Sequence, residues 1–210
     1  RGTAAVDVDA IQLLLDKFAY LVMDFPEIKE IDLNPFVVDE HGGMVLDAKM
    51  VLDEEIAGKT VRPFSHMVIC PYPKEYEKTI RLNNGKSVLL RPIRPEDEPL
   101  EAEMFTTFSA ETQRFRFFGP IGETTHEMLI RYTQIDYDRE MAIIAELMEE
   151  GRKKMAGVVR IISDPDNESA EYAIVIGDPW QRQGLGTVMT HYILEIARNR
   201  GLKKIYAYLL

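Results

Sequence analysis

The sequence predicts an α+β (α/β) fold in which strands and helices alternate along most of the chain. An apolar run at Ile174–Ile176 is typical of a strand, and Gly177-Asp178-Pro179 breaks it. Gly184 and Gly186 then begin a helical pattern that ends near Arg200. Small residues at a helix start let a phosphate group approach the exposed N–H groups and the positive end of the helix dipole. This stretch is therefore the expected ligand site.

The composition suggests two units of different charge. The 210 residues carry a net charge of −10, and residues 1–70 hold 13 acidic and 6 basic side chains against 22 and 19 in residues 71–210. We expect one unit at 1–70, a linker at 71–78 and a second unit at 79–210, with Pro71 and Pro73 stiffening the linker. The acidic balance argues against nonspecific nucleic-acid binding.

The cellular setting follows from what the sequence lacks. Cys70 is the single cysteine, so a disulfide framework within the chain is excluded and a reducing compartment such as the cytoplasm is expected. No apolar run is long enough to span a membrane, and no signal peptide begins the chain. The chain starts without a methionine, so we expect a fragment of a longer protein.

The first unit is expected to hold a helix and a β-hairpin. Apolar residues recur at helical spacing up to Asp24, with Asp9 as the expected cap. Ile28–Asp39 and Met44–Leu52 are the expected strands. A four-residue loop would place Asn34 opposite Asp47, whereas a five-residue loop would turn Asp47 to the other face.

The first of these registers would bring three oxygen-bearing side chains together. Asp32, Asn34 and Asp47 would then form a cluster of hard ligands suited to Mg²⁺. The alternative interpretation is a solvated sheet face with a turn-favouring Asn-Pro pair, and spacing alone favours it.

The second unit is expected to contain a hairpin, three short helices, three strands, a long helix and a final strand. The aromatic cluster Phe115, Phe117 and Phe118 is assigned to the core, although it could also wall an acyl pocket. The long helix has one apolar face. The expected elements are a hairpin of 79–82 and 87–91, helices at 97–108, from 109, and from a cap at Thr124 or Thr125 to about 134, strands at 141–147, 155–162 and 170–176, a helix at 184–200 with the apolar residues Leu185, Val188, Met189, Ile193, Ile196 and Ala197, and a strand at 204–210.

The first fifty residues resemble the C-terminal end of an ATP-grasp domain of the kind found in ADP-forming acyl-CoA synthetases. The resemblance rests on Arg1-Gly2, Asp24–Ile28, Glu30–Pro35 and Leu46-Asp47-Ala48. In that family the matching carboxylates and amide hold Mg²⁺ on the phosphates of ATP, which implies this role for Asp32, Asn34 and Asp47.

Residues 87–210 resemble the GNAT N-acetyltransferase superfamily, so an acyl-CoA N-acyltransferase fold preceded by a partial ATP-grasp subdomain is expected. The superfamily signature Q/R-x-x-G-x-G/A stands here as Gln181-Arg182-Gln183-Gly184-Leu185-Gly186, with a strand before it and a helix after it. The resemblance implies acetyl-CoA as cosubstrate, with its pyrophosphate on the backbone of Arg182 to Thr187 and its pantetheine arm along Ile174, Val175 and Ile176.

The resemblance also implies a general base. The amine acceptor must lose a proton, and a carboxylate near the thioester can take it. In lysine acetyltransferases of this superfamily a glutamate at the strand position of Glu171 has this role. The fold is expected to be truncated at its C-terminal end, because the helix that carries the usual proton donor would follow residue 210.

With an acyl-CoA synthetase-like region ahead of a GNAT-like region, the chain resembles the Pat-type protein lysine acetyltransferases of bacteria and archaea. Phe117–Ile121, Thr133–Met141 and Pro71-Tyr72-Pro73 agree with that family. It implies acetylation of lysine on a protein, notably an AMP-forming acyl-CoA synthetase. The alternatives are an ADP-forming acetate–CoA ligase with a GNAT appendage, a GNAT enzyme for small amines, or a non-enzymatic acyl-CoA sensor.

Overall fold

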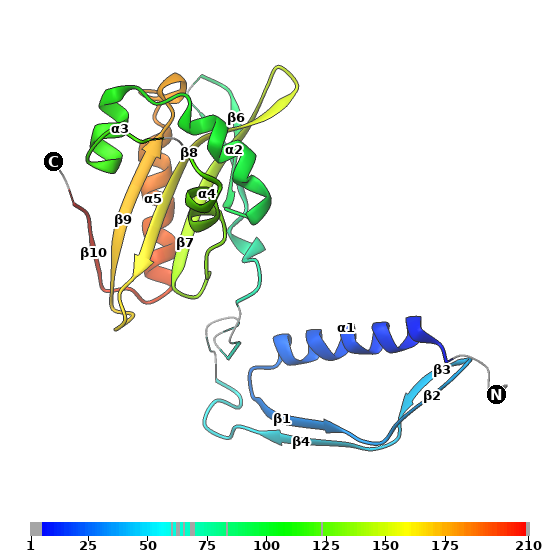
Figure 1. Ribbon diagram of the computed structural model, residues 1–210. Coiled ribbons are helices and arrows are strands. Elements are labelled where there is room, and N and C mark those ends of the chain that lie inside the picture. The colour runs from blue at the N-terminus through cyan, green and yellow to red at the C-terminus, as the bar shows by residue number, and fades with distance from the viewer. Residues whose placement is uncertain are drawn as a thin grey trace. The chain divides into compact units, whose positions relative to one another are not determined.

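The computed structural model forms two compact units, Arg1–Val68 and Ile69–Leu210 (Figure 1). It describes residues 6–59, 61, 64, 66–67, 70–82, 84–122 and 124–208. Arg1 and Gly2 of the ATP-grasp resemblance, and the last two residues of the expected final strand, lie outside the described residues. Among the described helices, none is both long and apolar enough to cross a bilayer.

The first unit consists of one helix beside paired strands (Figure 1). Helix α1 spans Val8–Asp24, and its cap is Asp7, whose side chain accepts a hydrogen bond from the N–H of Ala10 at 2.9 Å. The prediction of Asp9 as the cap is wrong, because Asp9 already has helical geometry in the first turn. The strands are β1 (Ile28–Leu33), β2 (Phe36–Asp39), β3 (Gly42–Val45) and β4 (Ala48–Leu52).

The strands pair as two ribbons instead of one continuous hairpin. Strand β1 pairs with β4 and β2 pairs with β3, and the Asn34–Pro35 bond between β1 and β2 is a cis peptide. The turn is shorter than expected, since Asp39 already pairs with Gly42. Asn34 nevertheless lies opposite Asp47, and the Asn34 N–H donates to the Asp47 carbonyl at 3.2 Å. This is the register expected from the shorter of the two loops.

The second unit is a six-stranded sheet with helices on both faces (Figure 1). The strand order is β10-β9-β8-β7-β6-β5, and every neighbouring pair is antiparallel except β10 and β9. Helices α2, α3 and α4 lie on one side of the sheet in Figure 1, and α5 lies on the other. The strands are β5 (Lys78–Arg81), β6 (Ser87–Pro92), β7 (Glu140–Glu149), β8 (Arg152–Ser163), β9 (Ser169–Ile176) and β10 (Lys204–Tyr206), and the helices are α2 (Glu98–Phe105), α3 (Ala110–Phe117), α4 (His126–Thr133) and α5 (Leu185–Asn199), with one-turn 3-10 helices η1 (Lys74–Tyr76), η2 (Pro95–Asp97) and η3 (Asp178–Trp180).

Each face of this sheet carries its own apolar core. The α5 side buries Leu185, Met189 and Ile193 against alternate residues of β6 to β9. Val188 does not belong to the buried face as expected, since it is 37% exposed. The core on the other side packs α2 and α4 against β7, β8 and Val175 of β9.

The aromatic cluster of α3 is only partly in the core. Phe117 packs edge-on against Phe105 at 5.8 Å between ring centroids. Phe115 and Phe118 are 61% and 56% exposed, so their assignment to the core is wrong. Helix α3 is short and lies at the edge of the layer, so only one of the three rings can turn inward.

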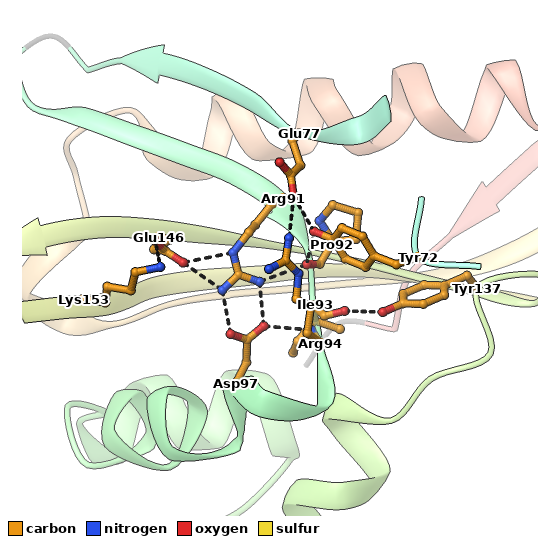
Figure 2. A network of polar contacts seen from close by, with 10 residues as sticks. All are labelled: Tyr72, Glu77, Arg91, Pro92, Ile93, Arg94, Asp97, Tyr137, Glu146 and Lys153. Atoms are coloured by element: carbon orange, nitrogen blue, oxygen red, sulfur yellow. Dashed lines mark hydrogen bonds and ion pairs between the residues drawn. The ribbon is translucent and has the colours of Figure 1, made fainter. Parts of the chain in front are cut away.

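A buried ion network joins β6, β7 and the start of α2 (Figure 2). Arg91 donates to both carboxylate oxygens of Asp97, at 2.7 and 2.6 Å, and to Glu146 at 2.9 and 2.8 Å. Lys153 pairs with the other oxygen of Glu146 at 2.9 Å. Burial alone would lower the pKa of Arg91, but the hydrogen bonds to Asp97 and Glu146 outweigh it and raise that pKa. The network fixes the chain where β6 leads into α2.

A second polar group holds the segment that precedes β5 (Figure 2). The Tyr72 hydroxyl donates to Glu77 at 2.9 Å, and the Arg94 guanidinium lies over the Tyr72 ring, 4.2 Å from its centroid. Tyr137 donates to the carbonyl of Ile93 at 2.7 Å. The proline-containing segment at 71–73 is therefore attached to the second unit.

Candidate functional site

A cleft of about 1190 Å³ lies between β9, α3 and the beginning of α5. Three elements that are distant in sequence form it, so its walls differ in character. Helix α3 supplies aromatic and basic side chains, β9 supplies apolar ones, and the loop before α5 supplies backbone groups. The lining residues are Ser109, Glu111, Thr112, Phe115, Arg116, Ile174, Val175, Ile176, Asp178, Gln181, Arg182, Gly184, Gly186, Thr187, Thr190 and His191.

The loop at one end of the cleft presents a row of backbone N–H groups. Arg182 and Gly184 have left-handed φ angles of +57° and +84°, which turn the chain sharply into α5. The first hydrogen bond of the helical ladder runs from the Val188 N–H to the Gly184 carbonyl at 3.2 Å. The N–H groups of residues 185–187 therefore precede the ladder, at the positive end of the helix dipole. Such an arrangement suits a phosphate.

Gln181 holds this loop against the end of β9. Its side-chain amide donates to the carbonyl of Ile176 at 2.9 Å and contacts Thr112 at 3.1 Å and Asp178 at 3.2 Å. Asp178 in turn accepts from the Thr112 hydroxyl at 2.7 Å. The side chain that begins the sequence signature thus positions the loop and joins it to α3.

Two signature residues turn their side chains away from the cleft. Gln183 donates to the carbonyl of Pro179 at 2.9 Å and accepts from Asn84 at 2.7 Å. Leu185 is buried in the core beneath the sheet. These two positions therefore offer only their backbone to a ligand.

One edge of β9 adjoins the cleft at Ile174–Ile176. Strand β10 pairs only with Ser169, Ala170 and Glu171, whereas β8 pairs with the inner edge up to Ile176. In the part of the chain that the structure describes, no strand pairs with the outer edge at 172–176. The beginning of α5 packs beside this part of β9, since a Cβ at Gly186 would lie at ordinary contact distance from the side chains of Ile176, at 3.7 Å, and Ile174, at 4.0 Å. An extended ligand can therefore add to β9 as a strand would.

Glu171 is half-buried, on the odd-numbered face of β9 that also carries Val175. It is the last β9 residue that pairs with β10, opposite Tyr206. It is not among the residues that line the cleft, but its carboxylate interacts electrostatically with Arg116 of α3, which does line it. Burial and the charge of Arg160 hold the pKa of Arg116 below its usual range, and the Glu171 carboxylate partly offsets this effect.

Residues 105–209 match the model of the acetyltransferase (GNAT) family, which is half of the chain. A curated acetyltransferase of Pseudomonas aeruginosa is 32% identical over 126 residues, which cover 60% of this chain and 68% of that protein. The chain belongs to the GNAT acetyltransferase family. It is therefore an acetyltransferase that transfers an acetyl group to an amine. In this family the acetyl donor is acetyl-CoA.

The fold agrees with solved members of the family. The GNAT domain of S. lividans PAT superimposes with a TM-score of 0.59 at 24% sequence identity, covering 66% of this chain and 81% of that one. The prediction of a GNAT acyltransferase fold is thus confirmed.

The first unit has separate relatives. Residues 1–52 match the model of an ATP-grasp domain. The ADP-forming acetate–CoA ligase I of Archaeoglobus fulgidus is 48% identical over 56 residues, which are 27% of this chain but only 8% of the ligase. A fragment of an ATP-grasp domain thus precedes the acetyltransferase domain, as expected.

The proposed magnesium residues lie at the surface of this fragment. Asp32, Asn34 and Asp47 are all exposed, and the register places Asn34 beside Asp47. In the described part of the chain, no group of three or more histidine, cysteine, aspartate or glutamate residues comes close enough to hold a metal. The magnesium site therefore stays a prediction that depends on the amide of Asn34.

The sequence indicated the α3 wall of the cleft only through Phe115, as the alternative to a place in the core. Thr112, Phe115 and Arg116 lie more than fifty residues before the signature, and only the sheet brings them together. Thr190 and His191 of α5 could have been found, because they lie one helical turn after Gly186 and Thr187, respectively, on the same helix.

Proposed function

We propose that the chain transfers an acetyl group from acetyl-CoA to the ε-amino group of a lysine on a protein substrate. The observation that carries the proposal is the cleft in which the free edge of β9 meets the N–H groups before α5. Its volume and its mixed polar and apolar lining suit a thioester with an amide arm and a phosphate-rich end.

In the proposed complex, the pyrophosphate accepts hydrogen bonds from the backbone of residues 182–187. The amide arm of the cosubstrate pairs with Ile174, Val175 and Ile176. The N–H of Val175 or Ile176 polarises the thioester carbonyl, because a backbone donor aimed at the developing oxyanion stabilises it. Gln181 contributes by holding the loop in position.

The chemistry needs one proton acceptor before the attack. A lysine ammonium gives a proton to Glu171, directly or through water. The neutral nitrogen then forms the new C–N bond, the C–S bond breaks, and its electron pair leaves with the sulfur. The second proton of the nitrogen goes to that sulfur, which leaves as the CoA thiol.

The order of the two units supports a protein substrate. An ATP-grasp fragment of the synthetase type ahead of a GNAT domain is the arrangement of the Pat-type enzymes that the sequence resembles. We propose that an AMP-forming acyl-CoA synthetase is the partner. The first unit, with Asp32, Asn34 and Asp47 as possible ligands for Mg²⁺ and ATP, would regulate the transfer.

The proposal is tested by incubating the intact natural protein with labelled acetyl-CoA and either an AMP-forming acetyl-CoA synthetase or spermidine. We expect label on a lysine of the synthetase. Acetylation of spermidine alone would instead show a small-molecule enzyme.

The role of Glu171 is tested by Glu171→Gln. We expect kcat to fall by roughly 10²–10⁴-fold, the usual contribution of a general base, with little change in the affinity for acetyl-CoA. Glu168→Gln is the matched control, since this carboxylate lies in the preceding turn and pairs with Lys203. Equal rates for wild type and Glu171→Gln would remove Glu171 as the base.

A second candidate function is that of an acetate–CoA ligase, because 56 residues of the chain are 48% identical to an ADP-forming enzyme of this kind. An ADP-forming acetate–CoA ligase would make ATP from acetyl-CoA, ADP and phosphate. ATP formation that depends on both ADP and phosphate, measured with the intact natural protein, would support this function.

A further inference from the structure

A small inner cavity of about 10 Å³ lies behind the cleft, between the sheet and helices α2, α3 and α4. Its size is close to the smallest that holds one water molecule. Arg116 and Val175 line both this cavity and the cleft, so the two spaces are neighbours. The cavity is lined by Glu101, Phe105, Arg116, Phe117, Tyr132, Val158, Arg160, Ala173 and Val175.

Glu101 of α2 is the unusual member of this lining. Its side chain is buried, with the residue only 1% exposed. Its Oε2 atom has no hydrogen-bond partner among the described residues. A buried carboxyl oxygen without a partner is costly, and such groups are found where a water molecule, ligand or reaction uses them.

The cavity lies on the face of β9 from which the acceptor amine is expected to approach. Every second residue of β9 points to that face, among them Glu171, Ala173 and Val175. Ala173 and Val175 also line the cavity. Glu101 is therefore beside the strand position at which the thioester carbonyl is expected.

We propose that Glu101 accepts the proton of the acceptor ammonium through one water molecule in the inner cavity and thereby shares this task with Glu171. The proton moves from the nitrogen to the water, and a proton of the water moves to Oε2 of Glu101. The remaining steps are unchanged: the C–N bond forms, the C–S bond breaks, and the second nitrogen proton leaves with the thiol. This inference rests on acetyl transfer as the function, but it does not require a protein as the acceptor.

The surroundings of Glu101 suit a base that works near neutral pH. Burial raises its pKa to about 7, Arg160 of β8 and Arg116 of α3 lower it, and Asp97 of η2 raises it. Tyr132 of α4 completes the polar lining. An acceptor is most effective when its pKa lies near the working pH.

Arg116 can hold the water in place. Its guanidinium lies 5.0 Å from the Phe117 ring centroid, and no hydrogen bond or ion pair joins it to another described side chain. Since it lines both spaces, it can donate to a water that also faces Glu101. The neighbouring Arg160 is already engaged, by Glu140 at 3.1 Å and by the carbonyl of Tyr132 at 2.6 Å.

The test is Glu101→Gln in the intact natural protein, because this change keeps the shape of the side chain and removes the proton acceptor. Acetyl-CoA consumption is followed from pH 5.5 to 9 with whichever amine the wild type acetylates. We expect kcat/KM to fall at least tenfold and the rising limb of its pH profile near 7 to be lost. Glu103→Gln is the matched control on the same helix, where the carboxylate pairs with Lys154 at the surface.

A merely structural role would give a different result. Unchanged rates, or lower rates with an unchanged pH profile, would overturn the proposal. Infrared spectroscopy gives an independent readout, because a protonated carboxyl that titrates near pH 7 should be present in wild type and absent in Glu101→Gln. Its absence from wild type would also overturn the proposal. If the protein acetylates only small amines, the proposal that a protein lysine is the acceptor is wrong, but this test of Glu101 remains valid.

Discussion

Replacing Asp97 by alanine removes one of the two carboxylates that surround the buried Arg91 (Figure 2). Asp97 is 4% exposed, accepts two hydrogen bonds from Arg91, and also accepts from the N–H of Arg94 at 2.8 Å. Breaking a buried ion pair from one side costs about 3–5 kcal/mol, because the remaining charge stays buried. Glu146 still compensates Arg91 in the variant, so we expect a loss of about 3 kcal/mol.

The single tryptophan provides the assay. Trp180 is buried in the second unit, so its fluorescence reports the unfolding of the domain that contains the network. A loss of this size should lower the urea midpoint by about 1–3 M, given m-values of about 1–3 kcal/mol per molar. Glu168→Ala is the control, because its exposed pair with Lys203 should be worth at most about 1 kcal/mol. If Asp97→Ala costs no more than the control, the network does not stabilise the start of α2.

Two further changes test the site. The pKa of about 7 for Glu101 lies above its value of 4.5 in the unfolded chain, so the unfolded state ionises first and wild type loses stability as the pH rises from about 4.5 to beyond 7. Glu101→Gln should therefore be more stable than wild type at pH 8, by at most about 3 kcal/mol, and the two should converge near pH 4 in urea titrations; parallel curves would contradict this. Gly184→Ala should weaken acetyl-CoA binding in calorimetry, because a left-handed φ of +84° costs a non-glycine residue about 1–2 kcal/mol and the relaxed loop would displace its N–H groups. Gly119→Ala, which meets no atom within 4 Å, is the control and should bind as wild type does.

Local patterns in the sequence were sufficient for most elements. The breakers after Ile176 and the glycines before the long helix predicted the strand, loop and helix of the ligand site, because these signals act within a few residues. Ser109 caps α3 by accepting from the N–H of Thr112, as expected, and of the two candidates Thr124 and Thr125 it is Thr125 that caps α4, by accepting from the N–H of Met128. Asp7 was missed in favour of Asp9 because two acidic residues near a helix start compete for the same cap.

Long-range features could not be predicted from these patterns. The exposed rings of Phe115 and Phe118 have the same local pattern as the packed ring of Phe117, and only the neighbouring helices decide which one is buried. The two partners of Arg91 lie 6 and 55 residues away from it, so the ion network depends on the pairing of β6 with β7. No local pattern indicated that Arg91 would be buried between them.

The sequence by itself determined the loop and helix start that offer backbone N–H groups, since glycine conformation and helix polarity are local properties. Only the tertiary structure decided which side chains stand across from them. The sheet order places α3 beside the free edge of β9, and the packing of α2 buries Glu101 behind the same strand. Burial removes that carboxyl from water, and this desolvation, which no residue pattern encodes, raises its pKa.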